Sequence, residues 1–373
     1  DVKDIRELSG METKISTEDK IKVGISHGDF NGISYEIILK TLADQRMLEY
    51  ITPVVYGSSK VISYYRKSLN LGDIKFQAVR RIDQVNPKRN NVMNCFDNEV
   101  RIEVGKLSPV AGEMALIALD KATDDLKNRN IDALVTAPIN KKSIHSEKFE
   151  FPGHTEYLAK KFESDDYLMM MISDEIKIGF VTGHVPLSDV SLDSETILSK
   201  IEVLHRSLFY DFNIRKPRIA LLGLNPHASD QGLIGKEEMN IITPAIEEAQ
   251  KRDILAFGPY ASDGFFGSGN YTKFDGILAM YHDQGMIPFK MISFERGANY
   301  TAGLPYVRTS PAHGTAFDIA GKNQASPDSL RYAIFLAVDI FRTREMNSEL
   351  NANPLRPATG DQNGTIPDDV TNQ

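Results

Sequence analysis

The chain has 373 residues, of which 41% are hydrophobic and 25% charged, the balance of an ordinary globular protein with about two domains. Its net charge of −8 argues against a broad nucleic-acid-binding face but leaves room for a small anion bound by a few basic residues. The single cysteine excludes an intrachain disulfide, and no apolar run approaches the ~18 residues of a membrane span, so we expect a cytoplasmic protein that binds neither nucleic acid nor membrane.

Short apolar runs alternate with helical patterns from residue 21 onward. Residues 1–20 are polar, lack an apolar period and are expected to be a disordered extension, with Met11 as a candidate natural start. The first half of the chain then gives six predicted elements in order: strand Ile21–Ser26, helix Asn31–Leu42, strand Thr52–Tyr56, helix Ser59–Leu69, helix Gly112–Lys127 and strand Ala133–Thr136.

The second half continues the alternation and ends in a polar tail. Residues 346–373 are expected to be disordered, because Asn, Pro, Asp, Gly and Thr dominate from Ser348 onward. Strands that alternate with helices predict an α/β fold with a largely parallel sheet. The predicted elements are strands Ile176–Thr182, Arg218–Leu224 and Gly276–Met280, and helices Glu195–Leu208, Glu238–Lys251 and Ser329–Arg344.

Three of the eight histidines, His184, His227 and His282, directly follow predicted strands. Open α/β sheets bind ligands at the carboxyl ends of their strands, so these side chains are expected to converge. Three imidazoles can hold a divalent ion and leave a position open for substrate. The pattern predicts a metal site, with Zn²⁺ expected first and Mg²⁺, Co²⁺ or Mn²⁺ as alternatives. The competing interpretation is that each histidine only caps a strand or bonds a turn.

Two carboxylates are candidates for catalysis at the same place. Asp283 directly follows His282, and Asp263 lies in the segment Gly258-Pro-Tyr-Ala-Ser-Asp. A carboxylate beside a metal can ligate it, orient another ligand or carry protons. The alternative role for both is a helix N-cap.

A second group of residues is typical of an anion site. Lys290, Asn299 and Arg308 lie within one stretch, and His154 and Thr155 begin a helical run where free backbone N–H groups favour an anion. The residue types therefore indicate an anion site. Solvated surface charges are the alternative interpretation.

Nucleotide-binding motifs are absent from the expected places. Gly28-Asp-Phe-Asn-Gly follows the first strand but lacks the spacing of a dinucleotide fingerprint, and no Gly-x-Gly-x-x-Gly or Walker A sequence occurs. A Rossmann cofactor site therefore has no support.

Four motifs together resemble the 4-hydroxythreonine-4-phosphate dehydrogenase family of pyridoxal-phosphate biosynthesis. They are Gly153-His-Thr-Glu-Tyr-Leu-Ala, Leu224-Asn-Pro-His-Ala, Tyr281-His-Asp-Gln-Gly and Gly303-Leu-Pro-Tyr-Val-Arg-Thr-Ser. The resemblance implies a two-domain fold of the isocitrate and isopropylmalate dehydrogenase type, which binds NAD without a Rossmann motif. It also implies a homodimer whose two subunits share each active site.

The resemblance assigns roles to the residues already singled out. It implies that the three histidines bind the metal, one of them from the other subunit, and that the anion group binds a phosphorylated substrate. The segment from His313 resembles the adenosine-binding loop of isopropylmalate dehydrogenases, in which an Asp at the place of Asp318 favours NAD over NADP. The implied cofactor residues are His313, Gly314, Thr315, Ala316 and Asp318.

The implied outer domain comprises residues 21–145 and 303–345, and the implied middle domain, with the dimer interface, residues 146–302. The implied reaction is NAD-dependent oxidation of 4-phosphohydroxy-L-threonine at C3, followed by decarboxylation to 3-amino-2-oxopropyl phosphate. One alternative is a dehydrogenase of threonate or erythronate 4-phosphate. An alternative of another class is a non-redox metal hydrolase with three histidine ligands, or a metal-binding protein without catalysis.

Overall fold

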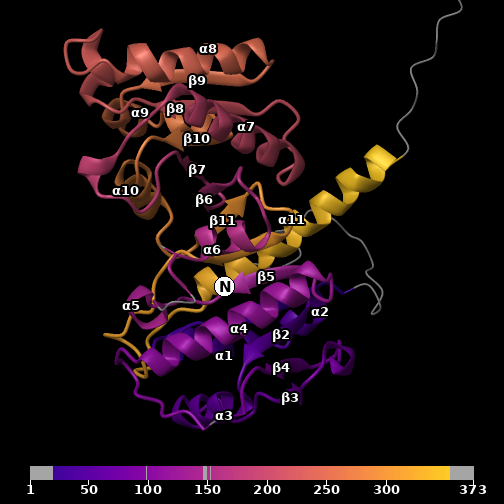
Figure 1. Ribbon diagram of the computed structural model, residues 1–373. Coiled ribbons are helices and arrows are strands. Elements are labelled where there is room, and N and C mark those ends of the chain that lie inside the picture. Colours follow the sequence, from indigo (N-terminus) through magenta and orange to yellow (C-terminus); the bar gives the residue numbers. More distant parts are fainter. Residues whose placement is uncertain (1–19, 98, 146–148, 152, 353–373) are drawn as a thin grey trace, which may run out of the picture.

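The computed structural model describes residues 20–97, 99–145, 149–151 and 153–352 (Figure 1). Its centre is one mixed sheet whose strands run in the order β3-β4-β2-β1-β5-β12-β11-β6-β7-β10-β8-β9. Strand pairs are parallel except β11 with β12, β11 with β6, and β6 with β7. The α/β class and the largely parallel sheet are therefore confirmed.

The strands of the described residues are mostly short and buried on both faces, which explains their continuous apolar runs. Strands β1 to β5 form one side of the sheet, together with β12. The strands of the described residues are β1 (Lys22–Ser26), β2 (Thr52–Gly57), β3 (Phe76–Val79), β4 (Asn90–Asn94), β5 (Ala133–Thr136), β6 (Leu168–Ile172), β7 (Lys177–Phe180), β8 (Arg218–Leu222), β9 (Leu255–Tyr260), β10 (Gly276–Ala279), β11 (Ala298–Ala302) and β12 (Val307–Pro311).

Helices pack along the sheet, with α4 against β1, β2 and β5, and α11 against β5, β11 and β12 (Figure 1). Among the described residues, every helix is too short or too polar to span a bilayer. The α-helices are α1 (Ser34–Leu42), α2 (Met47–Tyr50), α3 (Ser59–Ser68), α4 (Pro109–Lys127), α5 (Lys141–Ile144), α6 (His154–Lys161), α7 (Ser194–Tyr210), α8 (Thr243–Lys251), α9 (Ser262–Gly267), α10 (His282–Ile292) and α11 (Asp328–Ala352). Single turns of other helix types are η2 (Ile82–Gln84), η3 (Leu187–Asp189), η4 (Pro226–Asp230), η5 (Glu238–Ile242) and η6 (Asn270–Lys273).

Two neighbouring strands at the middle of the sheet bring distant segments together. β5 and β12 are parallel, with Arg308 opposite Leu134, and β11 runs antiparallel to β12, with Asn299 opposite Ser310. The carboxyl ends of β5 and β12 and the start of β11 consequently lie at one edge of the sheet. This edge is where a ligand site of an open α/β sheet is expected.

Three predicted helices differ from the structure at their first turns, and one of them, Gly112–Lys127, begins earlier, at Pro109. The predicted helix Asn31–Leu42 begins only at Ser34, because the preceding residues form turns. The predicted helix Glu238–Lys251 opens with the π-turn η5 before α8, where Pro244, near the start of α8, lacks the N–H that a continuous helix needs.

The predicted disordered tail is wrong at its beginning. Helix α11 continues to Ala352, and Asn347 Nδ2 donates to the carbonyl of Tyr210 at 2.9 Å, which ties the last turns to α7. Residues 353–373 lie outside the described residues, as do 1–19 of the predicted extension. The division into two domains stays a prediction, since the sheet continues across the proposed boundary.

Candidate functional site

A pocket of about 210 Å³ lies at the edge formed by β5, β11 and β12. It unites residues that are more than a hundred positions apart in the chain. Seven predicted site residues line it: His154, Thr155, His184, Asn299, Arg308, His313 and Gly314. The other lining residues are Thr136, Pro138, Ile139, Lys141, Gly153, Glu156, Ser310 and Pro311.

Arg308 is the most unusual side chain of the pocket, since only 2% of it is exposed. Its guanidinium donates to hydroxyls alone: Nε and Nη2 to Thr136 Oγ1 at 3.1 and 2.6 Å, and Nη1 to Thr301 Oγ1 at 3.2 Å. It forms no ion pair with the described residues. Burial lowers the pKa of Arg308 to about 9, partly opposed by the negative charge of Glu156. A buried cation that forms no ion pair is an incomplete arrangement that an anionic ligand would complete.

Three polar atoms of the pocket are buried without a hydrogen-bond partner among the described residues: His154 Nε2, Asn299 Oδ1 and His313 Nε2. An unsatisfied buried group costs about 1–3 kcal/mol, so three in one pocket indicate a bound polar ligand. Burial, helped by the charge of Arg308, lowers the pKa of His154 well below its usual range. Thr155 is buried and its hydroxyl lies 3.4 Å from that of Thr301, beside Arg308.

Lys290 is the predicted substrate residue that does not line the pocket. Its Nζ donates to the carbonyl of Ala312 at 3.1 Å, next to His313. Burial lowers the pKa of His313, and the charge of Lys290 lowers it further. Lys290 therefore lies behind His313, next to the residues that line the pocket.

His184 and His282 lie together, with ring centroids 5.1 Å apart. They follow β7 and β10, which are parallel neighbours with Phe180 opposite Ala279. The predicted convergence of these two histidines follows from that register. Although His184 is exposed at the pocket mouth, desolvation of its ring and the positive charges of Lys141 and His282 lower its pKa, which favours the neutral form that binds metals.

The carboxylate of Asp283 is paired with the ring of His282. His282 Nδ1 donates to Asp283 Oδ1 at 2.7 Å, which leaves the Nε2 lone pair free. This is the carboxylate–histidine arrangement that orients metal ligands. Asp263, at the start of α9, is exposed, and neither carboxylate lines the pocket.

The third predicted ligand is not part of this pair. His227 is exposed in the turn after β8, in a run from His227 to Gln231 whose φ values, 46° to 70°, are all left-handed. Each such residue costs roughly 1–2 kcal/mol. Asn225 anchors the turn, its N donating to Glu238 Oε1 at 2.7 Å. Among the described residues, no three His, Cys, Asp or Glu side chains form a group that could hold a metal.

The predicted cofactor loop divides into two parts. His313 and Gly314 line the pocket, whereas the carbonyl of Thr315 accepts from the N–H of Ile33 at 3.0 Å and docks the loop on the segment before α1. Ala316 has a left-handed φ of 41°, and Asp318 is exposed in the following turn.

Sequence reasoning missed three side chains of the pocket. Thr136 ends β5 and binds Arg308, Lys141 begins α5, and Glu156 is the carboxylate among the lining residues. The predicted strand Ala133–Thr136 could have indicated Thr136 and Lys141, because Thr136 is its last residue and Lys141 follows its carboxyl end. Glu156 stands in a motif that was read only for its His and Thr.

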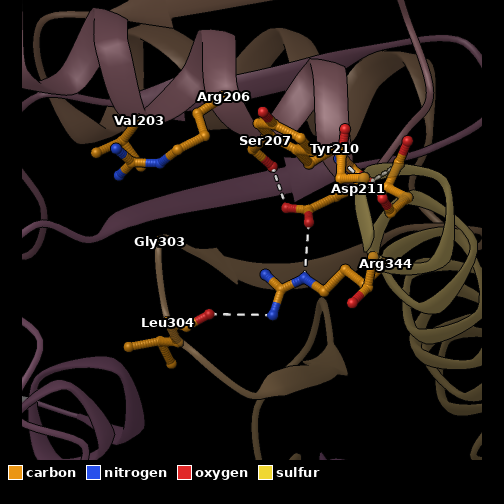
Figure 2. Close-up of a pocket in the computed structure, with 11 residues that line it drawn as sticks. Val203, Arg206, Ser207, Tyr210, Asp211, Gly303, Leu304 and Arg344 are labelled. Carbon is orange, nitrogen blue, oxygen red and sulfur yellow. Dashed lines mark hydrogen bonds and ion pairs between the residues drawn. The ribbon is translucent and has the colours of Figure 1, made fainter. Parts of the chain in front are cut away.

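A second, larger pocket of about 330 Å³ lies between α7 and α11 (Figure 2). Figure 2 shows Arg344 extending from α11 to Asp211, with Ser207 on the other side of the carboxylate. Arg344 Nε donates to Asp211 Oδ1 at 2.7 Å, Nη1 to the carbonyl of Leu304 at 3.1 Å, and Nη2 to Tyr300 Oη at 2.9 Å. The described residues that line this pocket leave no buried side-chain polar atom without a partner, so it is not the candidate site.

The model of the family "Pyridoxal phosphate biosynthetic protein PdxA" matches residues 49–337. The chain belongs to this family.

Relatives over nearly the full length agree with this result. The chain is 51% identical to the 4-hydroxythreonine-4-phosphate dehydrogenase of Bacteroides thetaiotaomicron, over 91% of this chain and 94% of that protein. It is 35% identical to the D-threonate 4-phosphate dehydrogenase of Salmonella typhimurium, over 88% of this chain and all of that protein. The solved 4-hydroxythreonine-4-phosphate dehydrogenase of Klebsiella pneumoniae superposes with a TM-score of 0.74 at 33% identity, covering 87% of this chain and 100% of that chain.

Proposed function

We propose that the chain is an oxidoreductase that converts 4-phosphohydroxy-L-threonine to 3-amino-2-oxopropyl phosphate in pyridoxal-phosphate biosynthesis. The C3 hydroxyl becomes a ketone when the hydrogen bound to C3 leaves as hydride and the hydroxyl oxygen loses its proton. The C1–C2 bond then breaks, CO₂ leaves, and C2 takes up a proton. Family membership supports the reaction type. The buried guanidinium of Arg308, which forms no ion pair with the described residues, indicates that the substrate is an anion.

The substrate phosphate would bind at Arg308. The guanidinium supplies charge, while His154, Thr155 and Asn299 supply polar groups around it, two of which have buried atoms without partners. Lys290 adds a positive charge from behind His313. Fixing the phosphate holds C3 at one place relative to the rest of the pocket, which lowers the entropic part of the barrier.

A divalent ion fits the pair His184 and His282. Two imidazoles with bonds of about 2 Å to one ion, at a tetrahedral angle, have ring centroids about 5 Å apart, close to the observed 5.1 Å. When bound, the ion would lower the pKa of the C3 hydroxyl and stabilise the negative charge that develops on decarboxylation. Asp283 holds the tautomer of His282 that leaves Nε2 free. Zn²⁺ is the expected ion.

The third imidazole would be His227 of the partner subunit in a homodimer, since His227 does not join the pair within one chain. Exposed apolar side chains in the segments after β7, β8 and β10 support this assembly, because such side chains mark interfaces. These side chains are Val185, Leu187, Leu233, Ile234, Met239, Ile287, Met291 and Phe294.

NAD fits the loop from His313 to Asp318. Asp318 is exposed, and its carboxylate forms no hydrogen bond or ion pair with the described residues, so it can accept from a ribose hydroxyl. NAD supplies a hydride acceptor, and the same carboxylate would repel the 2′-phosphate of NADP.

The test is NADH formation with each candidate substrate. We expect 4-phosphohydroxy-L-threonine to give the highest kcat/KM, with CO₂ released in equal amount. The alternative function, suggested by the Salmonella relative, expects D-threonate 4-phosphate to be the better substrate. Erythronate 4-phosphate, the other alternative that the sequence left open, is tested beside it. Release of inorganic phosphate without NADH formation would instead indicate the hydrolase and contradict the proposal.

A further inference from the structure

The pocket contains a second cation that the proposed function leaves unused. Lys141 lines the pocket, and its Nζ forms no hydrogen bond or ion pair with the described residues. Arg308 already meets the phosphate in the proposed function. The same substrate carries one more anionic group, the C1 carboxylate.

The backbone of Lys141 is held firmly although its side chain is free. β5 ends at Thr136, and Asn140 caps α5, its Oδ1 accepting from the N–H groups of Lys142 at 3.0 Å and Ser143 at 3.1 Å. The helix also lies directly against α4. A Cβ on Gly112 would come within 1.8 Å of the Ser143 carbonyl oxygen, so only glycine permits this approach. Lys141 therefore projects from a rigid turn at the pocket.

The two cations act at different parts of the pocket. Arg308 donates to Thr301, whose hydroxyl lies 3.4 Å from that of Thr155, so its guanidinium lies among the phosphate residues. Lys141 forms no hydrogen bond with these residues and lines the pocket together with His184, from the turn that follows β5. A four-carbon substrate with its phosphate on C4 and its reacting carbon beside His184 directs C1 away from Arg308.

We propose that Lys141 binds the C1 carboxylate of the substrate, an inference that rests on the proposed function. The ammonium holds the carboxylate until the C1–C2 bond breaks and its electron pair moves toward the C3 ketone. CO₂ then leaves without charge. The product retains its phosphate but has nothing to pair with Lys141, which favours its release over rebinding.

The experiment compares two substrates that differ only in the carboxylate. The first is 4-phosphohydroxy-L-threonine. The second is 3-amino-2-hydroxypropyl phosphate, in which hydrogen replaces the carboxylate and whose oxidation yields the same ketone. Lys141→Met is compared with Lys142→Met, a matched change of an exposed lysine that does not line the pocket, and with Lys141→Arg, which keeps the charge.

Lys141→Met should lower kcat/KM for the carboxylated substrate about 10- to 100-fold, mainly through KM, the range for one hydrogen bond to a charged group. It should leave the second substrate within about twofold, Lys141→Arg should recover part of the loss, and Lys142→Met should match the wild type. If the wild type oxidises the second substrate too slowly to measure, its inhibition constant serves as the same readout.

Equal losses on both substrates, or no loss on either, would overturn the assignment of Lys141. Failure of the proposed function is a separate result, recognised by a wild-type protein that forms no NADH with any of the phosphorylated acids.

Discussion

Two largely buried arginines make an instructive contrast. Arg344 in the α7–α11 pocket pairs with Asp211, and although burial opposes it, the Tyr300 phenol and the Asp211 carboxylate raise the pKa of Arg344 above its usual value. Arg308 has only hydroxyl partners, and burial lowers its pKa. Both lie in pockets, and the larger of the two surrounds Arg344.

The difference lies in which groups are satisfied by the protein itself. The Arg344 network is complete, so its energy goes into holding α7, α11 and the segment after β11 together. In the pocket of Arg308, His154 Nε2, Asn299 Oδ1 and His313 Nε2 have no partner among the described residues, so their hydrogen bonds are available to a ligand. We therefore expect changes near Arg308 to affect activity and changes near Arg344 to affect stability.

The largest effect is expected at the histidine pair. His282→Ala should abolish NADH formation and metal retention but change the melting temperature of the metal-free protein little, because the side chain is partly exposed. Steady-state assays, bound-metal analysis and thermal denaturation measure this. His145→Ala, a change of an exposed histidine that does not line the pocket, is the control. Normal turnover by the His282 variant would rule out the metal assignment.

The next largest effect is a difference in the free energy of unfolding between the Arg344 and Arg308 variants. Arg344→Met leaves Asp211, whose side chain is 5% exposed, without its cation and should lower the free energy of unfolding by about 3 kcal/mol. Arg308→Met removes a buried charge that has no acid partner and should leave stability unchanged or higher in the absence of ligand. Denaturant titrations of both variants test this, and an equal loss of stability in the two would remove the contrast.

The smallest of these effects is expected at the rim of the open site. Asp318→Lys should reduce the preference for NAD over NADP about tenfold or more, since it replaces a repelling charge with an attracting one near the 2′-position. The ratio of kcat/KM values for the two cofactors is the measurement, with Asp318→Asn as an uncharged intermediate. A wild-type protein that prefers NADP would contradict the role of this loop.

Strand ends were the part of the site that the sequence predicted best. The apolar runs before His184 and His282 are long enough to indicate strands, and parallel pairing brings their ends together. β11 and β12 read Ala-Asn-Tyr-Thr-Ala and Val-Arg-Thr-Ser-Pro, too polar to be recognised as strands. The pairing of Asn299 with Ser310, which helps to form the anion pocket, was accordingly not predicted. Asn299 and Arg308 were singled out by residue type, and their substrate role was implied by the family resemblance.

His227 illustrates what local patterns do not contain. Five consecutive left-handed residues without a glycine have no sequence signal, because each alone favours another conformation. Tertiary anchors such as Glu238 on Asn225 determine the turn. Whether His227 lies beside His184 and His282 depends on a second chain. No pattern within one chain encodes that arrangement.

The phosphate-binding role of Arg308 is tested most directly by kcat/KM of Arg308→Met on 4-phosphohydroxy-L-threonine and on the same compound without phosphate. Breaking a buried charge pair with the ligand costs about 2–5 kcal/mol, which corresponds to a loss of roughly 30-fold to several thousand-fold for the phosphorylated substrate. The rate on the dephosphorylated compound should barely change. Equal losses on both compounds would show that Arg308 supports the fold, as Arg344 does, and would contradict the account.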